Sequence, residues 1–107
     1  MTSWHTVDDI ESKELIPGYH AKMIHSERMT TIYWHIDKNA PLPEHSHPHE
    51  QIAHIIEGTF ELTIEGNTKI LEPGMVAVIP SNAKHSGKAI SDCRLLDVFA
   101  PVREDYK

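Results

Sequence analysis

Turn-forming residues interrupt this chain so often that little room is left for a long helix. Proline, glycine and asparagine turn signals stand near residues 17–18, 37–41, 58, 65–68 and 72–74. No segment of ten or more residues shows a convincing helical period. Many short strands joined by such turns are typical of a β-sandwich or a β-barrel. The chain is therefore expected to be all-β.

The runs between the turns have the composition and the alternation of strands. β-branched and aromatic residues, which suit a pleated and half-buried surface, are frequent in residues 29–36. Phe60, Leu62 and Ile64 share one face of a predicted strand, opposite a polar face. The other predicted strands are residues 19–25, paired with 29–36 in a hairpin, residues 69–71, the apolar run 75–79 and the alternating run 93–99.

The length of 107 residues is that of a single domain. Residues 1–18 are polar and acidic, and they end at a Pro-Gly turn, so they are expected to form an N-terminal arm with one short strand. Residues 19–107 are expected to form the folded barrel. The arm has too little apolar content to fold alone, which allows it to lie across a partner molecule.

Charge and composition exclude several classes of function. The formal net charge is −6 and the basic residues do not cluster, which argues against nucleic acid as a partner. No apolar stretch approaches the length that spans a membrane. The single cysteine, Cys93, cannot form an internal disulfide and is expected to be a small core residue. Since the first residues lack the features of a secretory signal, a cytoplasmic location is expected.

The segment 43–51 is the richest in metal-binding side chains. His45 and His47 are two positions apart, so in an extended chain both imidazoles leave the same face. Gln51 keeps that parity, and the three side chains can converge on one point. His85 is a fourth candidate, far along the chain. These four residues form the predicted site of a divalent metal, and imidazole-rich ligands suit nickel, zinc, iron or manganese.

Other side chains nearby compete for the same role. Glu50 has the opposite parity to His45 and His47, and His49 follows Pro48, where the strand bends, so His49 is expected near the site or at the surface. Gln51 itself could be a polar strand end outside the site. The remaining histidines are expected to be ordinary surface or hydrogen-bonded groups: His5, His20, His25, His35 and His54.

The spacing of these residues resembles that of the cupin superfamily. His45-x-His47-x-x-x-Gln51 followed by Gly58 matches its first motif, with Gln where Glu is commoner. Gly74 followed by Pro80-x-Asn82-x-x-His85 matches the second, with Asn where Gly is usual. Asn accepts positive φ more readily than most residues, so this exchange is tolerable. The resemblance implies a single-domain jelly-roll β-barrel that holds a metal ion.

A closer resemblance is to the pectin-degradation cupins of the KdgF family. It rests on residues 45–52, 57–58 and 95–105, and it spans roughly residues 17 to 106. It implies metal-dependent ring opening of 4,5-unsaturated monouronates, from pectin or alginate, to linear keto forms. It also implies acid–base and substrate-binding roles for Asp97, Phe99 and Arg103. A neutral Gln51 leaves the charge of the metal uncompensated, which favours an anionic substrate.

The residues themselves support some of these roles. Leu95, Asp97 and Phe99 share one face of the last strand, so a carboxylate stands in an apolar row where burial would raise its pKa. The alternatives are a solvent-facing Asp97 or one paired with an arginine. Arg103 could grip a sugar carboxylate or form a surface ion pair with Glu104 or Asp105. Phe99 is more often a core residue than a substrate platform.

Two other functions remain open from the sequence, because cupins carry many chemistries. One is an iron-dependent cupin dioxygenase, and the other is a non-catalytic cupin that binds or senses sugars. Small cupins resemble one another in forming dimers of their barrels, so a homodimer is expected. The expected ligand is a small anionic sugar.

Overall fold

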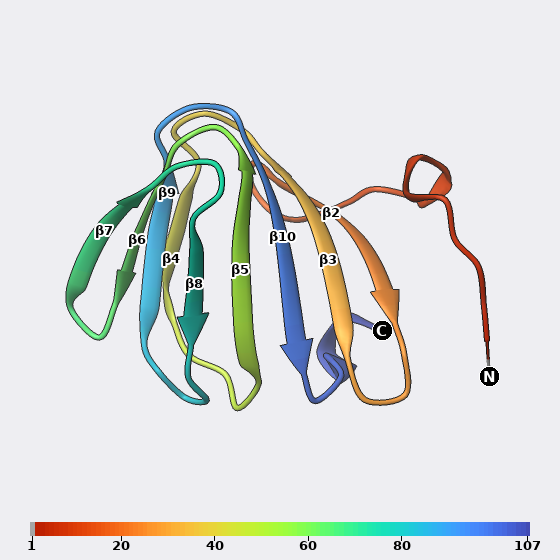
Figure 1. Ribbon diagram of the computed structural model, residues 1–107. Coiled ribbons are helices and arrows are strands. Elements are labelled where there is room, and N and C mark those ends of the chain that lie inside the picture. Colours follow the sequence, from red (N-terminus) through yellow and green to blue (C-terminus); the bar gives the residue numbers. More distant parts are fainter. Residues whose placement is uncertain (1) are drawn as a thin grey trace.

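The computed structural model describes residues 2–107, which form two antiparallel sheets and only two short 3₁₀ turns (Figure 1). The six-stranded sheet has the order β1 (Lys13–Ile16), β2 (Tyr19–His25), β3 (Thr30–Ile36), β10 (Cys93–Ala100), β5 (Glu50–Glu57) and β8 (Val76–Ile79). The four-stranded sheet has the order β4 (Pro41–His45), β9 (His85–Ala89), β6 (Phe60–Ile64) and β7 (Asn67–Leu71). The prediction of an all-β jelly roll is confirmed.

The two sheets face each other and enclose the hydrophobic core. Ile36, Ile55 and Leu95 contribute to it from the larger sheet, and Phe60 and Leu62 from the smaller one. From β4 onwards the chain crosses repeatedly between the two sheets, with only the β6–β7 hairpin remaining within one, so residues distant in sequence meet between the layers. Several of these core residues, Phe60 and Leu62 among them, also line a pocket between the sheets.

Most predicted strands lie where the sequence placed them. β2 and β3 form the expected hairpin, and the row of Phe60, Leu62 and Ile64 faces inward from β6. β7 begins earlier than expected, at Asn67, because Glu65 and Gly66 both have positive φ and reverse the chain in two residues. Gly58 is required at its turn, since its φ is positive and a Cβ there would clash with the Asp92 carbonyl oxygen.

The apolar run of β8 is buried on one side only. Ile79 is in the core, but Val76 and Val78 point outward and are exposed. In the sheet register Val78 lies opposite Ile52 of β5, which is also exposed. The outer surface of this sheet therefore carries a patch of apolar side chains.

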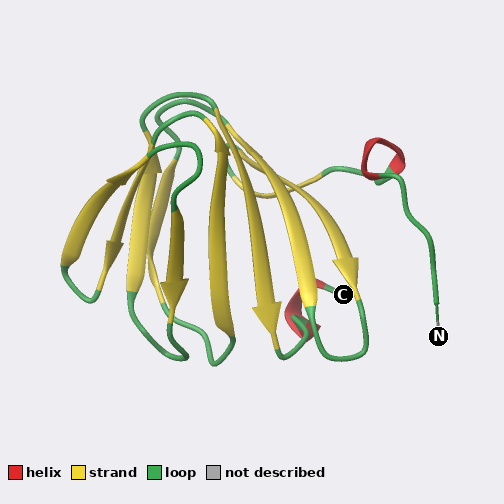
Figure 2. Ribbon diagram, in the orientation of Figure 1, coloured by secondary structure: helices red, strands yellow, loops and turns green. Residues whose placement is uncertain are grey.

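The two ends of the chain differ in how they meet the barrel. β1 pairs with β2 and extends the larger sheet, whereas the first residues run away from it, and Trp4 is 91% exposed (Figure 1). The C-terminal turn Glu104–Tyr106 lies against the sheets (Figure 2). The other 3₁₀ turn, Val7–Asp9, receives hydrogen bonds from Lys22 Nζ to its first two carbonyl oxygens. Neither these turns nor any other helix in residues 2–107 has the length and hydropathy to cross a membrane.

Candidate metal centre

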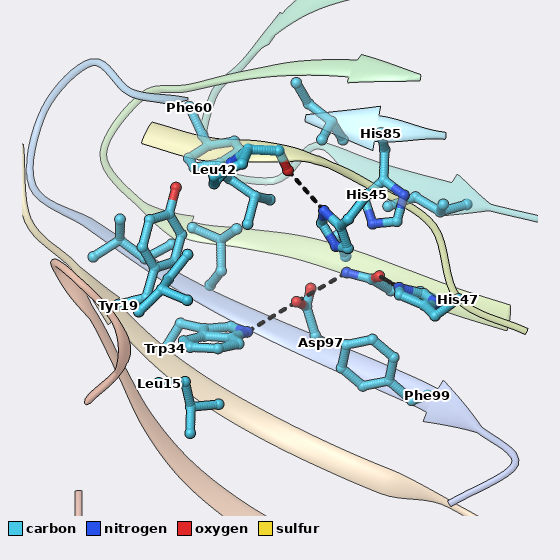
Figure 3. Close-up of a pocket in the computed structure, with 18 of the residues that line it drawn as sticks. Leu15, Tyr19, Trp34, Leu42, His45, His47, Phe60, His85, Asp97 and Phe99 are labelled. Carbon is cyan, nitrogen blue, oxygen red and sulfur yellow. Dashed lines mark hydrogen bonds between the residues drawn. The ribbon is translucent and has the colours of Figure 1, made fainter. Parts of the chain in front are cut away.

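Three histidines meet at one end of the space between the sheets (Figure 3). His45 ends β4, His85 begins β9 opposite it in the register, and His47 lies in the connection between β4 and β5. One ring nitrogen from each lies within 4.8 Å of the other two. Such a group can hold a metal ion, because imidazole nitrogen is a ligand for zinc, nickel, iron and copper.

The backbone fixes the orientation of each ring. Nδ1 of His45 donates to the Pro43 carbonyl oxygen, Nδ1 of His47 to that of His49, and Nδ1 of His85 to that of Ala83, each at 2.9 Å. A proton on Nδ1 leaves Nε2 with its lone pair. All three rings therefore present an unprotonated nitrogen to the same point, as metal-binding histidines do.

Electrostatics keep the buried rings neutral. Burial, together with the nearby Arg103 charge, lowers the pKa of His47 to about 4. Burial likewise lowers the pKa of His85. Neutral imidazoles are the form that binds metal, so these two histidines need no deprotonation near neutral pH to bind one.

The segments that carry the histidines are tied together. Asn82 N–H donates to the His47 carbonyl oxygen at 2.8 Å, and Ser81 Oγ donates to that of Pro48 at 2.6 Å. Asn82 has a φ of 65°, as expected for an asparagine where glycine is usual. Its backbone thus joins the loop before β9 to the loop between β4 and β5.

Gln51 lies beside the histidines but belongs to a different strand, β5. The prediction that one extended strand carries His45, His47 and Gln51 is wrong, because β4 ends at His45 and β5 begins in the other sheet. Gln51 Oε1 is 3.1 Å from His47 Nε2, so this oxygen faces the histidine group. Glu50 is exposed, in agreement with its opposite parity.

Asp97 is buried on the inner face of β10, with 5% of its surface exposed. Its Oδ2 accepts hydrogen bonds from Trp34 Nε1 at 2.9 Å and from Gln51 Nε2 at 3.0 Å (Figure 3). Its Oδ1 is also buried and has no hydrogen-bond partner among residues 2–107. Burial raises the pKa of Asp97 to about 6, although the hydrogen bonds from Trp34 and Gln51 act to lower it. This carboxyl group can gain or lose a proton near neutral pH.

Arg103 returns to the pocket from the segment after β10. Its backbone N–H donates to Thr30 Oγ1 at 2.8 Å. Its guanidinium donates to both carboxylate oxygens of Asp105, at 3.0 and 2.8 Å, and lies over the rings of Phe99 and Tyr106. The ion pair with Asp105 that the sequence offered as an alternative is present. It does not place Arg103 at the surface, however, because the residue is only 6% exposed and lines the pocket.

These groups line one cavity of about 270 Å³ between the sheets. Its polar wall consists of the side chains His45, His47, Gln51, His85, Asp97 and Arg103. The remaining wall is mostly apolar, and Phe99, buried and edge-on to His47, belongs both to this wall and to a small core cluster. A cavity with a few convergent polar groups suits a small molecule.

The other residues singled out by the sequence lie outside the cavity. His20 bonds to Asp37, His25 to Thr30 and His5 to Ser3. None of these histidines, nor His35 or His54, lines the cavity. Cys93 is buried, and its thiol donates to backbone carbonyl oxygens, as expected of a core residue.

Two residues that contact the polar groups of the cavity were not foreseen. Trp34 holds Asp97, and Tyr106 packs against Arg103. A signal existed for Trp34, since it shares the inward parity of Ile32 and Ile36, and a buried indole N–H needs an acceptor. For Tyr106, in a polar C-terminal segment, the sequence carries no comparable signal.

Comparisons with known proteins agree with this geometry. A family model described as a cupin domain matches residues 32–99. The pectin degradation protein KdgF of Dickeya dadantii (strain 3937) is 32% identical over 102 residues, covering 92% of this chain and 93% of that protein. The structure of KdgF from Halomonas sp. is similar with a TM-score of 0.94, at 27% identity over 100% of both chains. An RmlC-like cupin from Shewanella frigidimarina NCIMB 400 also has a TM-score of 0.94, at 24% identity over 100% of this chain and 97% of the other, which shows a shared fold.

Proposed function

The chain belongs to the cupin family, and we propose that it opens the ring of 4,5-unsaturated monouronates derived from pectin or alginate, giving linear 5-keto-4-deoxyuronates. The similarity to a pectin degradation protein supports this substrate class. The observation that carries the proposal is the position of Asp97, which lines the same cavity as the three-histidine group and Arg103 and whose Oδ1 has no hydrogen-bond partner among residues 2–107.

The residues present fit a divalent metal. His45, His47 and His85 would hold it through Nε2, with Gln51 Oε1 as a fourth ligand. When bound, the ion supplies positive charge that attracts the anionic substrate and stabilises developing negative charge on its oxygens. An all-neutral ligand set leaves this charge uncompensated.

The proposed reaction is an isomerisation that needs one group to move protons. The C4=C5 double bond carries the ring oxygen on C5, so the ring is already an enol ether. Loss of the C1 hydroxyl proton forms the C1 aldehyde and breaks the bond between C1 and the ring oxygen. A proton added at C4 then gives the C5 ketone. Atoms balance without an oxidant or a reductant.

Asp97 is the group that we propose moves this proton. In its ionised form Oδ1 accepts the C1 hydroxyl proton, and in its protonated form it returns a proton to C4. The pKa of about 6 allows both forms near neutral pH. Arg103 would orient the substrate by binding its carboxylate through the donors that Asp105 does not use.

Turnover of unsaturated galacturonate without oxygen tests the proposal. Loss of the ultraviolet absorbance of the conjugated double bond follows the reaction, and nuclear magnetic resonance identifies the keto product. A ring-opening enzyme keeps its rate under anaerobic conditions, whereas an iron-dependent dioxygenase stops and a sugar-binding cupin never turns over. Either of the last two results would refute the proposal.

Asp97→Asn tests the proton transfer in the same assay. It keeps the size of the side chain and removes the titrating group, so turnover should fall by at least ~100-fold. Its metal content should stay unchanged, because Asp97 is not a proposed ligand. Asp9→Asn, at an exposed position in the arm, is the matched control.

A further inference from the structure

Asp97 is held from both sides by residues of the two neighbouring strands. β10 lies between β3 and β5, and Asp97 pairs with Ile32 on one side and Ala53 on the other. Trp34 and Gln51 are the diagonal neighbours two residues away on those strands, and side chains in this relation share a face. Each donates a hydrogen bond to Asp97, and both bonds go to Oδ2.

The two carboxylate oxygens are therefore unequal. Oδ2 has two donors, whereas Oδ1 has none in the part of the chain that the structure describes. A proton on Oδ2 would point at two N–H donors and would be repelled by them, because neither the indole nor the amide nitrogen accepts a hydrogen bond. The proton that Asp97 exchanges is consequently carried on Oδ1.

Trp34 is itself held rigidly. Its ring meets that of Tyr19 edge to face, with centroids 5.9 Å apart and planes at 85°. The Tyr19 hydroxyl donates to the Ala40 carbonyl oxygen at 3.1 Å, and Tyr19 is buried. This chain of contacts fixes the direction of the indole N–H and, through it, the rotation of the Asp97 carboxyl group.

We propose that Trp34 is a positioning residue, which donates its indole N–H to Asp97 Oδ2 and thereby fixes the rotation of the carboxyl group, so that Oδ1 is the oxygen left for the substrate. The proposal rests on the ring-opening function above and extends it to a residue that does not need to touch the reacting atoms. It assigns a task to the indole nitrogen, separate from the apolar surface of the ring.

Trp34→Phe tests the kinetic consequence, since it keeps an aromatic ring against Tyr19 and removes the N–H donor. A loosely held carboxyl group should lower kcat by ~10–100-fold, while KM and metal content stay close to those of the unaltered protein. In an Asp97→Asn background the same substitution should cause no further loss of kcat. Trp4→Phe, at the exposed second tryptophan, should change nothing. A normal kcat for Trp34→Phe, or an equal loss in both backgrounds, would overturn the proposal.

The indole N–H signals give a test that does not depend on turnover. The chain has two tryptophans, so a ¹⁵N-labelled sample shows two such signals, which the two Trp→Phe variants assign. The Trp34 proton should lie downfield of the Trp4 proton and exchange slowly with water, and Asp97→Ala should shift it upfield. A Trp34 signal that exchanges as fast as that of Trp4, and does not respond to Asp97→Ala, would overturn the proposal even if Trp34→Phe failed to fold.

The two experiments separate this inference from the proposed function. An intact indole contact in a protein that does not turn over unsaturated uronates refutes the ring-opening reaction and the role of Trp34 in it. Turnover with no indole contact refutes the role of Trp34 alone.

Discussion

The side-chain amide of Gln51 donates to Asp97 Oδ2 at 3.0 Å, while the carbonyl oxygen of the same amide faces the histidine group. An amide can accept on one side and donate on the other, whereas a carboxylate can only accept. The glutamine therefore links the proposed ligand set to the proposed acid–base group. This relation gives a physical reason for glutamine at a position where other cupins commonly have glutamate.

Gln51→Glu should separate metal binding from catalysis. The new carboxylate would lie beside Asp97 without a hydrogen bond, and two like charges at this distance raise the pKa of one of them. Metal content, measured by mass spectrometry, should be retained, because a carboxylate is a good ligand for these ions. Turnover should fall by at least ~10-fold. A variant with nearly normal turnover would show that Asp97 does not need the amide donor.

His47→Ala should lower metal occupancy sharply. Loss of even a residue that supports a metal ligand typically weakens affinity by ~10–100-fold, and loss of a ligand should do no less. The protein would be purified without chelator and its bound metal measured by mass spectrometry. His54→Ala, on β5 but outside the cavity, is the control. If the unaltered protein holds less than about a tenth of an equivalent after soaking in nickel, zinc, iron or manganese, the metal assignment is wrong.

Asp97 should make the stability of the metal-free protein depend on pH. Its pKa is raised from 3.8 to about 6 on folding, so the folded state binds the proton more tightly than the unfolded state. The resulting stabilisation is complete below about pH 4 and is lost as the pH rises through 6. The Asp97→Asn variant stays neutral at this position, so the variant does not lose this stabilisation. Between about pH 4 and pH 7.5 its free energy of unfolding should therefore rise relative to that of the unaltered protein, by on the order of 3 kcal/mol.

Denaturant unfolding of chelator-treated samples at several pH values measures this difference. The difference between the two proteins is informative because other titrating groups contribute equally to both. If it stays constant from pH 4 to pH 7.5, the Asp97 carboxyl group has an ordinary pKa in the folded protein.

Arg103→Ala should chiefly weaken substrate binding. The guanidinium is proposed to grip the substrate carboxylate in both ground and transition states, so its removal should raise KM more than it lowers kcat. Asp105→Asn should act in the same direction but less strongly, because it loosens the side chain without removing it. Arg94→Ala removes a surface pair with Glu57, whose side chains are 59% and 68% exposed, and should leave both parameters unchanged. A large loss of kcat alone in Arg103→Ala would contradict the binding role.

A homodimer remains a prediction, and the outer face of the larger sheet offers a surface for it. Ile52, Ile56, Val76 and Val78 are exposed there on adjacent strands, where a second copy of the chain could cover them. Light scattering at tens of micromolar should give twice the mass of 12.2 kDa, and Val78→Lys should reduce it towards the monomer. A monomeric unaltered protein would contradict this.

The histidine motif shows what the sequence could predict and what it could not. Spacing and parity brought together His45, His47, Gln51 and His85, which do line one cavity. The same parity argument placed the first three on a single strand. Alternation of side chains along the sequence does not show where the chain leaves one sheet and enters the other. That crossing depends on loop contacts such as Asn82 N–H to the His47 carbonyl oxygen, between residues far apart in the chain.

The sequence predicts which side chains are buried only where buried and exposed residues alternate along a strand. Asp97 was correctly placed in an inward row, and Trp34 could have been, since it alternates with Ile32 and Ile36. Their contact depends on the register of β3 against β10, which alternation does not determine. Val78 shows the converse, because an apolar residue in an apolar run proved to be exposed.

In each hydrogen bond that orients one of the three rings, Nδ1 donates to a carbonyl oxygen two residues away in the same local stretch of chain. No side chain other than the histidine itself takes part in each bond, so replacing a neighbouring side chain does not release a ring as long as the backbone keeps its path. The walls of the cavity can then diverge during evolution while the metal-facing end stays in place. An ancestor could acquire a new substrate by altering residues such as Asp97, Phe99 and Arg103, with no need to rebuild the histidine group.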